Sequence, residues 1–318
     1  MTGEDIDMFR EREQEQRREK NRDESICDTH IDGAWKMKKI ISNETRDEER
    51  AYYSSFNCAF ENVKISGPAD GESAFKECKD IETNNCVFDL RYPLWHVNGL
   101  EVKNSSFSDT CRASLWYTKN VKMSYCEIRG IKAFRECENI NVIESKIYSD
   151  EVFWRVSNIE IKNTLIEGVY AFFQCSNIDI DNVGFTGKYS FQYTENVEIC
   201  DSTLNTKDAF WHSKNVTVRN SVINGEYLGW YSENLTLINC KISGTQPLCY
   251  AKGLKIIDCT MDDCDLAFEY SEVDGIIVGK VKSIKNPLKG KLIVEHCDEF
   301  IKDEHDRSNN LFELVEVN

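Results

Sequence analysis

A repeat of 19 residues constrains this chain more than any other feature. Seven asparagines stand at that spacing, and Gly253 continues the series (Asn120, Asn139, Asn158, Asn177, Asn196, Asn215 and Asn234). Gly99, Asp80 and Asn57 take the same place further back with small insertions, which gives about eleven repeats between residues 57 and 271. Such a period is typical of a solenoid, in which each repeat stacks on the next.

The pattern inside the repeat indicates strands. With the asparagine as position 1, positions 2 and 4 are apolar, as in Ile140 and Val142, and this alternation is a strand signature. Position 6 is usually Asn or Asp and position 9 is apolar, which indicates a turn and a second strand. Position 15 is large and apolar in most repeats, as in Phe172, and predicts a third strand. We therefore predict an all-β parallel β-helix of about eleven 19-residue coils, each with three short strands.

The recurring asparagines have a structural role in this prediction. Asparagine tolerates left-handed backbone angles better than most residues, and its amide can bond to the same residue one coil away. We expect a ladder of such bonds along the solenoid. Leucine-rich repeats need a leucine-dense consensus that is absent, and 19 is not a multiple of the six residues of a left-handed hexapeptide helix.

Charge and composition exclude some partners. The formal net charge of −16 and a pI near 4.9 disfavour nucleic acid and anionic lipid surfaces. No run of 18 apolar residues exists that could form a spanning helix, so no membrane partner is expected. The first residues are charged where a secretory signal would be apolar, so we expect a cytoplasmic protein with its 14 cysteines as reduced thiols.

Several segments resemble a known family. They are "GPADGESAF" (67–75), "RYPLWH" (91–96), "GKYSFQY" (187–193), "TKDAFWH" (206–212), "GEYLGWY" (225–231) and "TQPLCY" (245–250). With the repeat, they make the stretch from Met37 to about residue 300 similar to an uncharacterised bacterial family of right-handed, pectin-lyase-like β-helix proteins of unknown function. The resemblance implies a right-handed, single-stranded solenoid and no established activity, and so no catalytic residue.

The chain divides around the repeats. Residues 1–36 are charge-dense and predicted to be helical or disordered. Residues 37–56 are expected to form an N-terminal cap, 57–271 the β-helix repeats, 272–302 C-terminal strands and a cap, and 303–318 an acidic tail.

Aromatic residues recur at positions 16 and 17, beside the core residue at position 15. Because neighbours on a strand alternate, we expect position 16 to point outward. With the polar corner at positions 12 and 13, these residues predict one face along the solenoid that binds an extended carbohydrate-like ligand. The predicted ligand-binding residues are Arg91, Trp95, His96, Arg112, Trp116, Tyr117, Lys188, Tyr193, Lys207, Trp211, Tyr227, Trp230, Tyr231, Gln246 and Tyr250.

Two alternatives stay open. The first is a glycoside hydrolase or polysaccharide lyase that uses the same face, with Asp208, Glu226 and His212 as the candidate catalytic group, since hydrolysis needs two carboxylates that flank the bond. A corner salt bridge to Lys207 or Lys188 would be the structural explanation of these carboxylates. The second is a scaffold that self-associates through the aromatic face or through the ends of the solenoid. We expect no metal and no cofactor, because Cys-x-x-Cys is absent.

Overall fold

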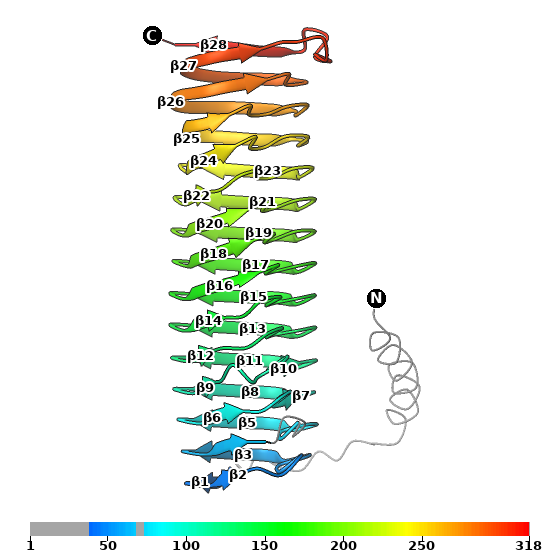
Figure 1. Ribbon diagram of the computed structural model, residues 1–318, viewed down its shortest axis with the longest axis vertical. Coiled ribbons are helices and arrows are strands. Elements are labelled where there is room, and N and C mark those ends of the chain that lie inside the picture. Colours follow the sequence, from blue (N-terminus) through cyan, green and yellow to red (C-terminus); the bar gives the residue numbers. More distant parts are fainter. Residues whose placement is uncertain (1–37, 68–72, 318) are drawn as a thin grey trace, which may run out of the picture. The chain divides into compact units, whose positions relative to one another are not determined.

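The stacked coils predicted from the repeat are present. The computed structural model describes residues 38–67 and 73–317, and they form a right-handed parallel β-solenoid of about 14 coils (Figure 1). There are more coils than the eleven expected, because stacking continues beyond the regular register at both ends. The predicted extension at residues 1–36 lies outside the described part. Within that part, no helix is long and apolar enough to span a bilayer.

Two parallel sheets form two sides of each coil. The strands of the first sheet are β1 (Lys39–Ser42), β3 (Phe56–Glu61), β5 (Lys79–Asn84), β8 (Asn98–Lys103), β11 (Lys119–Ser124), β13 (Glu138–Ile143), β15 (Ser157–Lys162), β17 (Ser176–Asp181), β19 (Glu195–Cys200), β21 (Lys214–Arg219), β23 (Glu233–Ile238), β25 (Leu254–Asp265), β26 (Val273–Lys285), β27 (Gly290–Ile301) and β28 (Phe312–Glu316). The strands of the second sheet are β2 (Thr45–Arg46), β4 (Lys64–Ser66), β6 (Val87–Asp89), β9 (Ser106–Phe107), β12 (Glu127–Ile128), β14 (Lys146–Tyr148), β16 (Leu165–Val169), β18 (Gly184–Lys188), β20 (Thr203–Lys207), β22 (Val222–Asn224) and β24 (Lys241–Thr245). β25 continues from the first sheet into the second, where it pairs with β24.

The apolar positions of the repeat fill one continuous core. In β17, Ile178 and Ile180 are buried while Asp179 between them is exposed, as the alternation predicted. The position-15 phenylalanines stack ring on ring inside the solenoid, with centroids 4.5 to 5.0 Å apart (Phe134, Phe153, Phe172, Phe191 and Phe210). All described cysteines are free thiols, and most are buried in this interior.

The asparagine ladder is confirmed. Asn177 donates from Nδ2 to Oδ1 of Asn158 at 2.9 Å and accepts from Asn196 at 3.1 Å, and these bonds continue from Asn98 to Asn234. Asn177 has a positive φ of 56°, which asparagine tolerates well.

The third side of the coil is mostly a run of turns. Among the described residues, only β7 (Leu94–Trp95) and β10 (Leu115–Trp116) are strands there. In most coils positions 13, 15 and 17 have positive φ, as in Tyr170 (58°), Phe172 (59°) and Gln174 (56°). Left-handed angles cost about 1–2 kcal/mol for such residues. Here these angles let successive N–H groups bond to the coils on either side: Tyr170 N–H donates to the Lys188 carbonyl of the following coil at 2.8 Å, and Phe172 N–H to the Val152 carbonyl of the preceding coil at 2.9 Å. These hydrogen bonds between coils offset the cost of the left-handed angles.

The ends of the solenoid differ from the expected boundaries. The 37–56 segment contains the first coil, because β1 pairs with β3 and β2 with β4. The expected acidic tail contains β28, which pairs with β27 from Gly290 onward. This strand forms at the end of an acidic segment because three of the four residues from Phe312 to Val315 are apolar, with Glu313 as the exception.

Candidate ligand-binding face

A column of five stacked rings lies on the third side, at position 17. The column consists of Tyr193, His212, Tyr231, Tyr250 and Tyr270. The centroid of the His212 ring lies 5.0 Å from that of Tyr193 and 4.9 Å from that of Tyr231, with interplanar angles of 9° and 6°. Tyr231 and Tyr250 follow at 4.8 Å, and Tyr270 is tilted at 5.8 Å. Tyr193 and Tyr231 are 50% and 42% exposed, so the column is a surface feature.

The position-16 tryptophans lie on the same side but are held against the backbone. Trp154, Trp211 and Trp230 each donate the indole N–H to a carbonyl of the next coil, at 2.6 to 2.7 Å. These three tryptophans are half-buried. Trp116 is only 9% exposed, although it does not belong to the apolar core inside the solenoid. The expectation of an outward tryptophan row is therefore only partly met, because the indoles close the junction between coils.

Ring faces on this side are covered by other planar or charged groups. Trp211 stacks on Trp230 with 5.3 Å between centroids and an angle of 3°. Lys76 Nζ lies 4.1 Å from the Trp95 ring centroid, and the Arg307 guanidinium lies 4.8 Å from that of Tyr270. A ligand on this side would therefore meet ring edges and phenol hydroxyls more than open ring faces.

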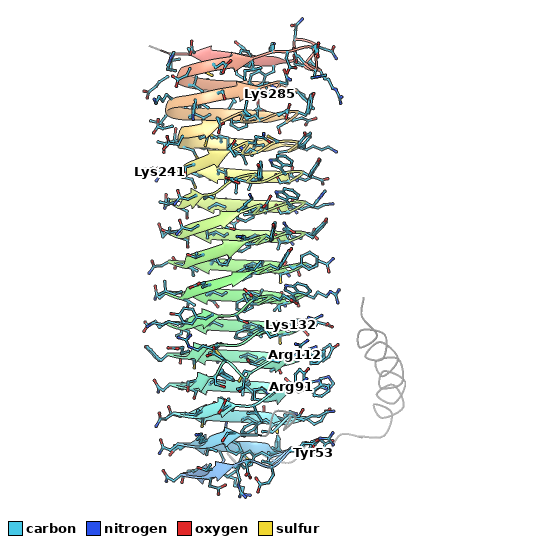
Figure 2. The ribbon with its side chains drawn as sticks, in the orientation of Figure 1. Tyr53, Arg91, Arg112, Lys132, Lys241 and Lys285 are labelled. Carbon is cyan, nitrogen blue, oxygen red and sulfur yellow. The ribbon has the colours of Figure 1, made fainter. Side chains whose placement is uncertain are left out.

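The predicted ligand-binding residues fall into two groups. The first, on neighbouring coils, is Arg91, Trp95, His96, Arg112, Trp116 and Tyr117, and Figure 2 shows Arg91 and Arg112 one above the other. Here Nε1 of Trp95 and of Trp116 is buried with no acceptor among the described residues. The second group contains Tyr193, Tyr231 and Tyr250 of the ring column, together with Lys188, Lys207, Trp211, Tyr227, Trp230 and Gln246. At position 17 the coils between the groups carry Glu136, Arg155 and Gln174.

The candidate catalytic residues lie in the second group. Lys207 Nζ and Glu226 Oε2 form a salt bridge at 2.7 Å, which confirms the structural explanation for Glu226. Asp208 is 6% exposed, and burial raises the pKa of its carboxyl group; Lys207 opposes that shift and Glu226 adds to it. His212 is exposed, with both ring faces stacked in the column. A catalytic role for the three stays a prediction.

Two features escaped the sequence reasoning. Tyr270 completes the ring column, but it follows Tyr250 by 20 residues instead of 19 and was hidden by the lost register. Asp181, Cys200 and Asp201 form the one group in the described residues whose ligand atoms, all within 4.8 Å of one another, could hold a metal ion. Burial, then a hydrogen bond to Asp181, raises the pKa of the Cys200 thiol to about 11, so the thiol is protonated at neutral pH.

The fold and its repeat define a right-handed parallel β-helix protein. Residues 39–315 match the family described as "Protein of unknown function (DUF3737)", and the chain belongs to that family. No curated protein matches the sequence.

Three solved structures among those that match are similar to this chain at low sequence identity. The A-module of the mannuronan C-5 epimerase AlgE4 from Azotobacter vinelandii is 7% identical, with a TM-score of 0.27 over 88% of this chain and 89% of that one. The periplasmic alginate epimerase AlgG is 7% identical, with a TM-score of 0.28 over 83% and 78%. Tailspike protein 3 of bacteriophage CBA120 is 11% identical, with a TM-score of 0.24 over 87% and 51%.

Proposed function

We propose that the ring column and the side chains beside it bind an extended carbohydrate-like ligand along the solenoid axis. The observation that supports this most is the column itself. Five rings follow one another at the repeat of the coils, and Tyr193, His212 and Tyr231 are exposed. Soluble proteins seldom expose a continuous aromatic strip without a binding use for it.

The chemistry of the column fits a chain of hydroxyl-bearing units. Stacked rings expose their edges and their phenol hydroxyls, which repeat at about the 4.8 Å spacing of parallel strands. Each hydroxyl both donates and accepts hydrogen bonds, and the His212 ring adds a further nitrogen. The apolar ring edges would contact the C–H groups of a sugar, while the hydroxyls bond to its O–H groups.

Polar side chains border the column on its corner side. Lys188 and Lys207 are aligned on neighbouring strands, and Lys207 is joined to Glu226. Tyr227 packs edge-on against Trp230 at 5.4 Å, and its carbonyl accepts the indole N–H of Trp211. The face thus combines a fixed aromatic base with charged groups at one border, as expected for a site that orients a polar ligand.

The test compares two exposed tyrosines. Tyr231→Ala removes a ring from the column, and Tyr125→Ala removes a ring that is 57% exposed but lies after β11, outside the column. On an array of neutral and charged glycans, we expect Tyr231→Ala to lose binding that the unchanged protein and Tyr125→Ala retain. Tyr231→Phe separates the hydroxyl from the ring, and should weaken binding less than Tyr231→Ala.

Sedimentation of the same samples identifies the competing use of the face. If the unchanged protein binds no glycan and Tyr231→Ala turns an oligomer into a monomer, the column is a subunit interface and the proposal is wrong. Equal glycan binding by all four proteins would also contradict it.

A further inference from the structure

Asp208 stands at position 13, which holds Lys132, Glu151 or Gln246 in other coils and a tyrosine in the coils on either side of it. Position 13 holds Tyr170 and Tyr189 in the two coils before it and Tyr227 in the next. The backbone geometry is the same, because Asp208 N–H donates to the Glu226 carbonyl at 2.9 Å as Tyr189 N–H donates to that of Lys207 at 2.7 Å. Asp208 therefore differs from its neighbours in its side chain alone.

The Asp208 carboxylate makes no hydrogen bond to residues 38–67 or 73–317, and its oxygens are not among the fully buried unpartnered atoms of those residues, so they keep some contact with solvent. The residue as a whole is 6% exposed. Among the described residues, one side chain forms a hydrogen bond with Asp208, and it does so with the backbone: Gln192 Nε2 donates to the Asp208 carbonyl at 3.1 Å. Lys207 is engaged by Glu226 at 2.7 Å. A carboxylate that loses most of its water and gains no donor destabilises the folded state.

Backbone conformation does not explain the aspartate. Its φ is 57°, and aspartate is better suited to that region than most residues. Tyr170, Tyr189 and Tyr227, however, have φ values of 58°, 56° and 57° at the same place. The corner therefore accepts a tyrosine, and a residue that departs from its own repeat at the expense of stability is typical of a functional position.

On the basis of the proposed function, we infer that Asp208 anchors the ligand by accepting hydrogen bonds from its hydroxyl groups, and that the face selects neutral sugar chains. A carboxylate has two acceptor oxygens and can bond to two neighbouring hydroxyls at once. A uronate unit would bring a second negative charge beside Asp208 and Glu226, on a chain of net charge −16. The opposing charges are Lys207, which Glu226 balances, and Lys188 on the neighbouring strand.

The experiment uses Asp208→Asn, which keeps shape and backbone preference but removes the charge. Asp179→Asn is the matched control, because Asp179 is an exposed carboxylate in β17, on the first sheet. The probes are the neutral hexasaccharides cellohexaose, maltohexaose and xylohexaose, and hexagalacturonate as the charged chain of equal length. Binding is measured by calorimetry and stability by thermal melting.

We expect Asp208→Asn to melt no lower than the unchanged protein and to bind the preferred neutral probe about tenfold more weakly, as for the loss of one charge-assisted bond. Asp179→Asn should change neither. A lower melting temperature for Asp208→Asn would show a structural role and overturn the inference, as would unchanged binding or tighter binding of hexagalacturonate by the unchanged protein. If no probe binds, the proposed function fails together with this inference, whereas binding that ignores Asp208→Asn removes this inference alone.

Discussion

The asparagine ladder allows a sharp test of what the repeat contributes to stability. Asn177 combines a φ of 56° with two ladder bonds, of 2.9 Å to Asn158 and 3.1 Å from Asn196. Both substitutions to alanine and to glycine remove these bonds. Solvent-exposed bonds contribute at the low end of the usual range, so their joint loss costs about 1 kcal/mol.

The two substitutions differ in backbone conformation. Alanine must adopt the left-handed region, which adds about 1–2 kcal/mol, whereas glycine enters it freely and adds about 0.5–1 kcal/mol of lost chain entropy. We therefore expect Asn177→Ala to cost about 2–3 kcal/mol and Asn177→Gly about 1.5–2 kcal/mol. Gly99 and Gly253, which take the place of the asparagine in other coils with φ of 77° and 62°, agree with this order.

The assay is thermal melting of four variants. At Asn177 the alanine variant should melt about 2–4 °C below the glycine variant, from the usual conversion for a large domain. At Asp179, two residues further along β17 and outside the positive-φ positions, the order should reverse, because glycine is there the poorer residue. If Asn177→Ala is as stable as Asn177→Gly, the positive φ does not determine which residues suit this position, and the reasoning is refuted.

Three further outcomes follow from the third side and the core. Trp211→Phe removes the indole bond to the Tyr227 carbonyl and should cost about 1 kcal/mol by urea titration, whereas Trp116→Phe loses no such bond among the described residues and should cost less. The pKa of Asp208 is raised in the folded state, so its ionised carboxylate lowers the free energy of unfolding at every pH above that pKa. This loss of stability disappears below the unfolded pKa of about 3.9, where the group is protonated in both states. The difference in melting temperature between Asp208→Asn and the unchanged protein should therefore be largest near pH 7 and shrink toward pH 3. Burial raises the pKa of Cys78 and of Cys175 to about 12, so a thiol reagent at pH 8 should label these two cysteines only when denaturant is added; their rapid labelling in the native protein, located by mass spectrometry, would contradict their burial.

The sequence was sufficient to predict the parts of the fold that depend on the 19-residue period. Apolar positions 2 and 4 pointed to the core strands, and the asparagines at position 1 pointed to their ladder, because both properties belong to the residue and its spacing. The coil number was too low because β26 to β28 pair with their neighbours, with register shifts on both sides of β26, without keeping that spacing in the chain.

The orientation of the site residues could not be predicted in the same way. Strict strand alternation places position 16 outward and position 17 inward. The left-handed angles at Phe172 and Gln174 break that alternation, so Ala171 and Phe172 are both buried and position 17 turns outward. Bulky residues avoid these angles in isolation, and they adopt them here because of bonds between coils that a single repeat cannot show.

Position 17 shows that the stacking of coils does not by itself require rings. In the earlier coils the place is filled by Glu136, Arg155 and Gln174, where Arg155 lies 3.7 Å from the Glu136 carboxylate and donates to Gln174 at 3.2 Å. That polar column joins successive coils just as the ring column does from Tyr193 to Tyr270. Polar side chains also keep the surface soluble, so the change to five consecutive rings brings an exposed aromatic strip that the fold can do without. At position 13, likewise, Asp208 differs from the tyrosines of the coils on either side of it. Both features lie on one side of the same coils, which is why we propose a ligand as the explanation that accounts for them together.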